Sequence, residues 1–80
     1  MFYHEAIESI LTNEKESLET MKEGELKITQ PCICKSEAGF YIGEWCIEKT
    51  GNNLLLPQPY QRLSGYMSES DAVEQLPHYL

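Results

Sequence analysis

The sequence predicts a single α+β domain, built from an N-terminal helix, a three-stranded antiparallel sheet and a short C-terminal helix. Three observations support this class. Apolar side chains recur at helical spacing near the N-terminus, two apolar segments flank a short polar turn, and a serine-capped apolar segment closes the chain. Because 80 residues suffice for one core only, we expect residues 1–80 to form one domain. The order helix, strands, helix suggests that the helices pack on one face of the sheet.

The first segment predicts a helix. Its apolar positions recur every three or four residues and are Phe2, Ala6, Ile7, Ile10, Leu11, Leu18 and Met21. Glu14 interrupts this stripe, and Asn13 followed by Glu16 resembles a capping box, so one kinked helix and a pair of helices both satisfy the pattern. Gly24 is suited to the position that follows the last helical turn.

The next segment predicts a β-hairpin with strands Glu25–Ser36 and Gly39–Lys49. A two-residue loop at Glu37–Ala38 places Ser36 opposite Gly39. In this register one apolar set shares a face, namely Leu26, Ile28, Cys32, Cys34, Tyr41, Trp45 and Ile47. A shift by one residue would place the apolar side chains of the first strand beside glutamates of the second, so we favour the first register.

A third strand is predicted after the turn at residues 50–53. Leu54, Leu55 and Leu56 form its apolar core. Pro57 and Pro59 follow directly, and proline cannot donate a hydrogen bond to a neighbouring strand. We therefore expect this strand either to lie at an edge of the sheet or to leave the sheet at the prolines.

The final segment predicts a short helix. Ser68 is a favourable N-cap, and Asp71 occupies the third position of the first turn. The apolar side of this helix consists of Ala72, Val73 and Leu76. Pro77 is expected to end it.

The net charge of −7 is unevenly distributed along the chain. Residues 1–25 carry −5, residues 26–67 carry +1 and residues 68–80 carry −3. Because no basic stripe exists, direct nucleic-acid binding is disfavoured. No apolar run approaches the ~18–20 residues of a membrane span, and the N-terminus lacks the basic start of a signal peptide, so we expect no membrane partner and a cytoplasmic location.

The three cysteines, Cys32, Cys34 and Cys46, are an odd number and suggest free thiols in a reducing compartment. With His4 or His78 they could form a zinc site. The predicted register argues against this, because it places Cys46 on the opposite face from the other two. We therefore expect structural thiols, no metal and no cofactor.

No catalytic constellation is present in the sequence. His4 and His78 lie near the chain ends outside any motif, and there is no Gly-x-Ser-x-Gly elbow, so we expect no enzymatic activity. Three sets of residues are candidates for binding a partner. They are the acidic helical face Glu16, Glu19 and Glu23; the proline-stiffened group Tyr60, Arg62 and Tyr66; and the reverse face of the hairpin, Ile33, Phe40 and Ile42.

Each candidate set has a structural alternative. The glutamates suit a solvated helix face, and the aromatic group suits packing of an edge strand. The reverse hairpin face can be covered by the C-terminal helix, by a second copy of the chain or by another protein.

We predict a small acidic protein-interaction module that regulates or inhibits a partner protein. In one version the acidic helix imitates nucleic-acid phosphates. The alternatives are a self-associating structural protein, with a homodimer as its simplest form, and a small metal- or ligand-binding domain that uses the three cysteines.

Overall fold

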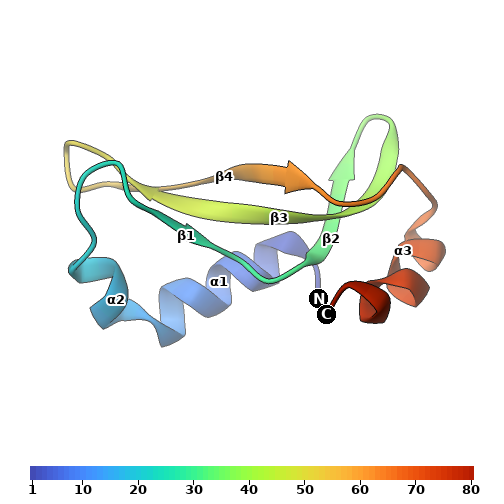
Figure 1. The fold of residues 1–80 in the computed structure, drawn as a ribbon, viewed down its shortest axis with the longest axis horizontal. Coiled ribbons are helices and arrows are strands. Elements are labelled where there is room, and N and C mark those ends of the chain that lie inside the picture. The colour runs from blue at the N-terminus through green and yellow to red at the C-terminus, as the bar shows by residue number, and fades with distance from the viewer.

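The computed structural model describes residues 1–80 and shows an α+β fold with a four-stranded antiparallel sheet (Figure 1). The elements are, in chain order, α1 (Tyr3–Asn13), α2 (Lys15–Glu19), β1 (Leu26–Ile28), β2 (Cys32–Ser36), β3 (Gly39–Lys49), β4 (Leu55–Arg62) and α3 (Glu69–Gln75), which continues as a 3₁₀ turn, Leu76–Tyr79. The predicted fold class is confirmed, although the sheet has four strands rather than three.

The N-terminal segment forms two helices that are separated at Glu14. This residue leaves the helical conformation, with φ −125° and ψ 35°, and its carboxylate forms an ion pair with Lys27 of β1 at 2.8 Å. Asn13 does not cap α2, because its side-chain amide donates to the Ser9 hydroxyl instead. The helix pair is therefore the correct alternative, and the break brings a carboxylate to the sheet.

β3 is the central strand of the sheet. β1 and β2 pair in succession along one of its edges, and β4 pairs along the other. The predicted turn is confirmed, since Ser36 lies opposite Gly39. Gly39 has a φ of +130°, which a side chain would disfavour. β4 has β3 as its only neighbour, which confirms the edge position that Pro57 and Pro59 predict.

The predicted first strand is broken between β1 and β2. Cys32 pairs with Gly43, but Ile28 pairs with Cys46, so the register has moved by one residue across the break. Pro31 supplies no N–H group to the ladder, and residues 29–31 form a bulge opposite two residues of β3. As a consequence Leu26 and Ile28 lie on the face opposite to the predicted one. The favoured register is correct for β2 and wrong for β1.

The helices pack on both faces of the sheet, which corrects the expected one-sided arrangement. α1 and α2 contribute Ile7, Ile10 and Leu18 to a cluster around Ile47 of β3. α3 and the turn after it cover the opposite face of the β2–β3 hairpin with two apolar residues, Ala72 and Leu76. Because the hairpin turns sharply away from the rest of the sheet, all three helices still lie on the same side of the molecule in Figure 1.

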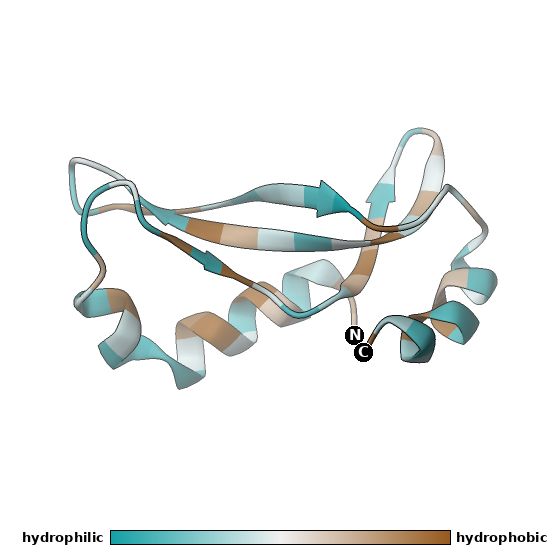
Figure 2. Cartoon of the chain, in the orientation of Figure 1, coloured by the Kyte–Doolittle hydropathy of each residue, from teal (hydrophilic) through white to brown (hydrophobic).

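The ends of the C-terminal helix follow the sequence signals. The Ser68 hydroxyl accepts a hydrogen bond of 3.2 Å from the Asp71 backbone N–H, as the predicted cap requires. α3 ends at Gln75, and Pro77 lies within the 3₁₀ turn that follows. Figure 2 shows hydrophobic bands alternating with hydrophilic residues along α1, as expected for a helix that buries one face.

Candidate functional site

The predicted apolar face of the hairpin is covered by the chain itself. Ile33 and Ile42 are only 2% and 0% exposed and lie in one cluster with Ala72 and Leu76, while Phe40 packs against this cluster. The structure thus selects the C-terminal helix among the three possible covers. These residues therefore do not form the exposed patch through which the hairpin was predicted to bind a partner.

The predicted acidic face is only partly assembled. Glu16 and Glu19 are exposed and lie one turn apart on α2. Glu23 lies beyond the end of that helix, with its carboxylate close to Gly51, so it does not extend the same face. The only ion pair of the chain joins Glu14 to Lys27, which leaves the exposed glutamates without a cationic partner.

The aromatic group at the C-terminal end of β4 is brought together in part. The Arg62 guanidinium lies over the ring of Tyr66, 4.6 Å from its centroid. Tyr41, which the sequence did not place in this group, meets Tyr66 edge to face with ring centroids 5.8 Å apart. Tyr60 is exposed at the extra position of a β-bulge, where Trp45 pairs with Pro59 and the preceding residue of β3 pairs with Gln61.

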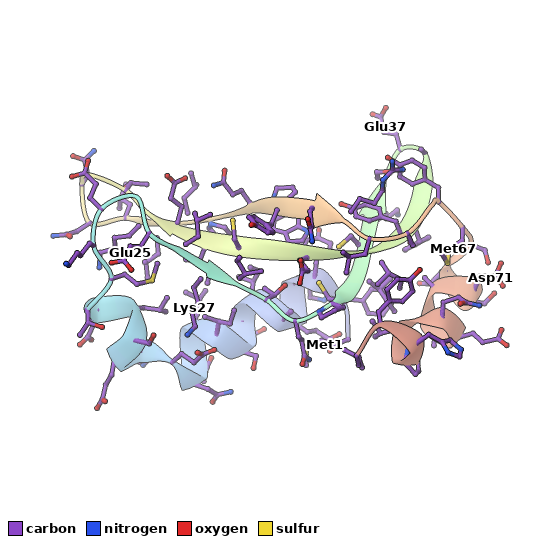
Figure 3. All side chains as sticks on the ribbon, viewed as in Figure 1. Met1, Glu25, Lys27, Glu37, Met67 and Asp71 are labelled. Carbon is purple, nitrogen blue, oxygen red and sulfur yellow. The ribbon has the colours of Figure 1, made fainter.

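The sheet has an outer face, turned away from α1 and α2, that no helix covers over β1, β4 and the adjoining half of β3. It consists of Leu26, Ile28, Glu44, Cys46, Glu48, Leu56, Gln58 and Gln61. Figure 3 shows side chains projecting from this face with no further layer above them.

Three large apolar side chains are half exposed on this outer face. Leu26 and Ile28 of β1 are each 43% exposed, and Leu56 of β4 is 48% exposed. Leu26 and Leu56 lie on either side of Glu48 in one cross-strand row. Sequence reasoning missed this site because it assigned the β1 side chains to the core. The signal that could have found it is Pro31, whose interruption of the strand shifts the register by one residue.

The carboxylates of the outer face are held by amides rather than by cations. The Gln58 side-chain amide donates to Glu48 at 2.8 Å, and that of Gln61 donates to Glu44 at 2.9 Å. The two nearby lysines of the sheet bind groups of the N-terminal helices, on the opposite side of the sheet. Lys27 reaches the break between α1 and α2 (Figure 3), and the Lys49 ammonium donates to the backbone carbonyl of Leu18. The outer face therefore carries uncompensated negative charge.

A pair of thiols lies between α1 and the sheet. Cys32 and Cys34 are buried on the same face of β2, and their sulfur atoms are 4.0 Å apart. They pack with Ala6 and Trp45 in one cluster. The prediction that these two sulfurs lie beside the indole is confirmed.

The two thiols influence each other's ionisation. A hydrogen bond from Cys34 lowers the pKa of Cys32 to about 7, against the opposing effect of burial, and Thr29 also contributes. The pKa of Cys34 is raised, because its proton is held by Cys32 and because the group is buried. Burial likewise raises the pKa of Tyr41 to about 12. Of the two thiols, Cys32 is therefore the more acidic.

Cys46 is separate from this pair. It is buried on the outer side of β3 opposite Gln58, and burial raises the pKa of its thiol. The three sulfurs thus do not surround a common centre, and no group of three or more His, Cys, Asp or Glu side chains is arranged to hold a metal ion. The predicted placement of Cys46 on the opposite face is confirmed.

Comparison with known proteins finds no family model that matches the chain, no similar curated protein and no similar solved structure. The helices are also too short and too polar for any of them to cross a membrane. We therefore infer function from the surfaces of the molecule and their chemistry.

Proposed function

We propose that the chain is a non-enzymatic protein-interaction module that binds a basic partner protein through the outer face of its sheet. The observation that carries this proposal is the half-exposed set Leu26, Ile28 and Leu56, which spans the sheet without a covering layer. Covering apolar surface gains about 25 cal/mol per Å², and exposed apolar patches commonly mark interaction sites. Regulation or inhibition of the partner is the role we assign to such binding.

The charge of the outer face defines the chemistry of the partner. Glu44 and Glu48 would be desolvated when the apolar residues of the same face are covered. A carboxylate that leaves water needs an opposite charge or strong hydrogen bonds in return. Because each glutamate has only an amide partner here, the bound surface must supply Lys or Arg side chains.

Self-association through this face is disfavoured by the same charges. A second copy would bring the same glutamates and another net charge of −7. Edge-to-edge pairing is disfavoured as well, because Pro57 and Pro59 lie two residues apart on β4. Both prolines still pair with β3, so their nitrogen atoms, which carry no hydrogen, face the free edge of the strand. A second strand would therefore find no N–H donor at these two positions.

The exposed glutamates Glu16 and Glu19 support the same partner chemistry at longer range. Uncompensated charge of one sign speeds the diffusional encounter with a protein of opposite sign. Imitation of nucleic-acid phosphates is a narrower version of this role. The three free thiols support a reducing compartment such as the cytoplasm as the setting.

Site-specific photo-crosslinking in the expressing cell tests the proposal. A benzoylphenylalanine at Leu56 should form a discrete adduct with a basic protein, whereas the same group at exposed Leu11 on α1 should not. The variant Glu48→Lys should lower the adduct yield at Leu56 at least about tenfold, because like charges then meet. Adducts only between two copies of the chain, equal adducts at both positions, no adduct, or indifference to Glu48→Lys would each overturn the proposal.

A further inference from the structure

The Cys32–Cys34 pair has the geometry of a reactive dithiol. Alternate residues of a strand point to the same face, and here this brings the two sulfur atoms to 4.0 Å. Two Cα atoms separated by two strand residues of about 3.3 Å rise lie roughly 6.6 Å apart. Disulfides join Cα atoms that are about 4.4–6.8 Å apart, so a bond between these residues is near the upper limit. The Cβ atoms of two such residues lie about as far apart as their Cα atoms, beyond the roughly 3.5–4.5 Å that a disulfide requires, so β2 must distort locally for the pair to close.

Donors around the pair favour a thiolate at Cys32. The Thr29 hydroxyl accepts a hydrogen bond from the Trp45 backbone N–H, so its own proton is free to point at the Cys32 sulfur, 3.8 Å away. The Cys34 thiol lies 4.0 Å from this sulfur and donates to the Cys32 backbone carbonyl, so it becomes a second donor to Cys32 by rotating. Ionisation of Cys32 gives up the hydrogen bond of 3.4 Å that its own thiol donates to the Gly43 carbonyl. The thiolate is the nucleophilic form of cysteine, and a pKa near neutrality makes it available.

The surroundings of Cys34 supply further polar groups. The indole N–H of Trp45 is buried without a hydrogen-bond partner and lies in the same cluster as Cys34. A hydrogen bond from the Tyr41 hydroxyl also lowers the pKa of the Cys34 thiol, against the larger effects that raise it. Apolar surroundings alone would leave both thiols inert, whereas these donors can stabilise negative charge as it moves between the sulfurs.

A cleft opens at the surface beside the cluster that contains the pair. It lies between α1 and β1 and has a volume of about 250 Å³. Ala6 and Thr29 line it, and both also adjoin Cys32. Cys32 is 0% exposed and does not line the cleft, so a molecule as small as hydrogen peroxide reaches its sulfur from there only when Ala6 or Thr29 moves aside.

We propose that Cys32 and Cys34 form a redox-active dithiol that hydrogen peroxide oxidises to an intramolecular disulfide. The Cys32 thiolate attacks one peroxide oxygen, the O–O bond breaks, and the departing hydroxide takes a proton to become water. The Cys34 sulfur then attacks the resulting sulfenic acid, the S–O bond breaks, and the thiol proton leaves with hydroxide as a second water. One peroxide is thus reduced as two thiols are oxidised.

The bond would be reversible by cellular thiols. Closing it draws the sulfurs from 4.0 Å to about 2 Å and pulls on β2 beneath α1. Disulfides formed against such resistance are the ones most easily reduced, and transient redox-sensing bonds are the type found in reducing compartments.

Peroxide treatment of the full chain followed by denaturing alkylation tests the proposal. Untreated protein should take up three alkyl groups and treated protein one, with the mass lowered by two hydrogens before alkylation. Peptide mapping should place the remaining alkyl group on Cys46. Dithiothreitol should restore all three sites. The fluorescence of Trp45, the sole tryptophan, should change and recover in parallel because its ring contacts the pair.

Two variants control the experiment. Cys46→Ala should form the disulfide at an unchanged rate, whereas Cys34→Ser should stop at a Cys32 sulfenic acid that dimedone traps. Preferential oxidation of Cys46, bonds only between two chains, or Cys46→Ala protein that is folded by circular dichroism and keeps both thiols would each overturn the proposal.

Discussion

The Thr29 hydroxyl accepts a hydrogen bond of 3.0 Å from the backbone N–H of Trp45, while the Trp45 carbonyl accepts one of 2.8 Å from the Thr29 N–H. This reciprocal pair bridges the bulge between β1 and β2, where regular pairing with β3 is interrupted. It satisfies a buried N–H group and fixes the hydroxyl beside Cys32. One threonine therefore supports both the sheet and the dithiol.

Replacing Thr29 by valine should lower both stability and thiol reactivity. The change leaves the Trp45 N–H without its acceptor, which costs about 1–3 kcal/mol in the free energy of unfolding. Loss of the hydroxyl donor should also slow peroxide oxidation of Cys32. Urea denaturation and timed alkylation measure the two effects. Thr12→Val, at an exposed position, should change stability by less than about 0.5 kcal/mol. Equal effects of the two substitutions would contradict the role given to Thr29.

The stability of the reduced chain should pass through a maximum near pH 9. Cys32 has a folded-state pKa of about 7 and an ordinary value of 9.0, so between these values the unfolded chain binds more protons and stability rises with pH. Above pH 9 the unfolded thiols of Cys34 and Cys46 ionise, while burial keeps the folded ones protonated. Stability should then fall, by up to about 1.4 kcal/mol per pH unit for each group.

Chemical denaturation at a series of pH values measures this profile. Tyr41, with a folded-state pKa of about 12 against an ordinary 10.0, should steepen the fall above pH 10. The variant Cys32→Ser should lose the rise between pH 7 and 9 while keeping the part of the descent that comes from Cys46. A wild-type profile without a rise in that window would disprove the lowered pKa of Cys32.

Two glycine substitutions should separate a strained turn from an open one. Gly39→Ala introduces a side chain at a φ of +130° and places its Cβ 3.2 Å from the Met67 carbonyl oxygen, so we expect a loss of about 1–3 kcal/mol. Gly65→Ala meets no atom within 4 Å and should be nearly neutral. Thermal unfolding of both variants measures the difference. Similar unfolding temperatures would contradict the conformation assigned to the hairpin turn.

The outer face should tolerate polar substitutions without loss of the fold. Ile28→Ser and Leu56→Ser remove half-exposed side chains, so each should cost about 1 kcal/mol or less. Ile42→Ala, beneath α3, should cost about 2–5 kcal/mol because it leaves a cavity. Equilibrium unfolding compares them. A cost at Leu56 as large as that at Ile42 would show that the outer face is covered.

Local signals predicted those parts of the fold that depend on neighbouring residues. The two-residue turn set the pairing of Ser36 with Gly39, and Ser68 set the start of α3. The proline pair of β4 identified the edge strand. In each case the responsible residues are adjacent in sequence, so the physical cause is visible without tertiary contacts.

Long-range packing decided the parts of the fold that local signals did not predict. The bulge at Thr29 and Pro31 inverted β1 and moved Ile28 from the predicted core to the surface. α3 closed over Ile33 and Ile42, which the apolar pattern alone could not assign to a cover. The outer face therefore appears only when the register across the bulge is known.

β3 is the one strand that every other strand contacts, and this organises how the molecule opens. Detachment of β4 would break only its own pairing with β3, whereas loss of β3 removes the partner of all three remaining strands. Amide hydrogens of β3 such as that of Ile47 should accordingly exchange with solvent only through global unfolding. Those of β4 that bond to β3 should exchange through smaller, more frequent openings, so the proposed binding face adjoins the least protected part of the sheet.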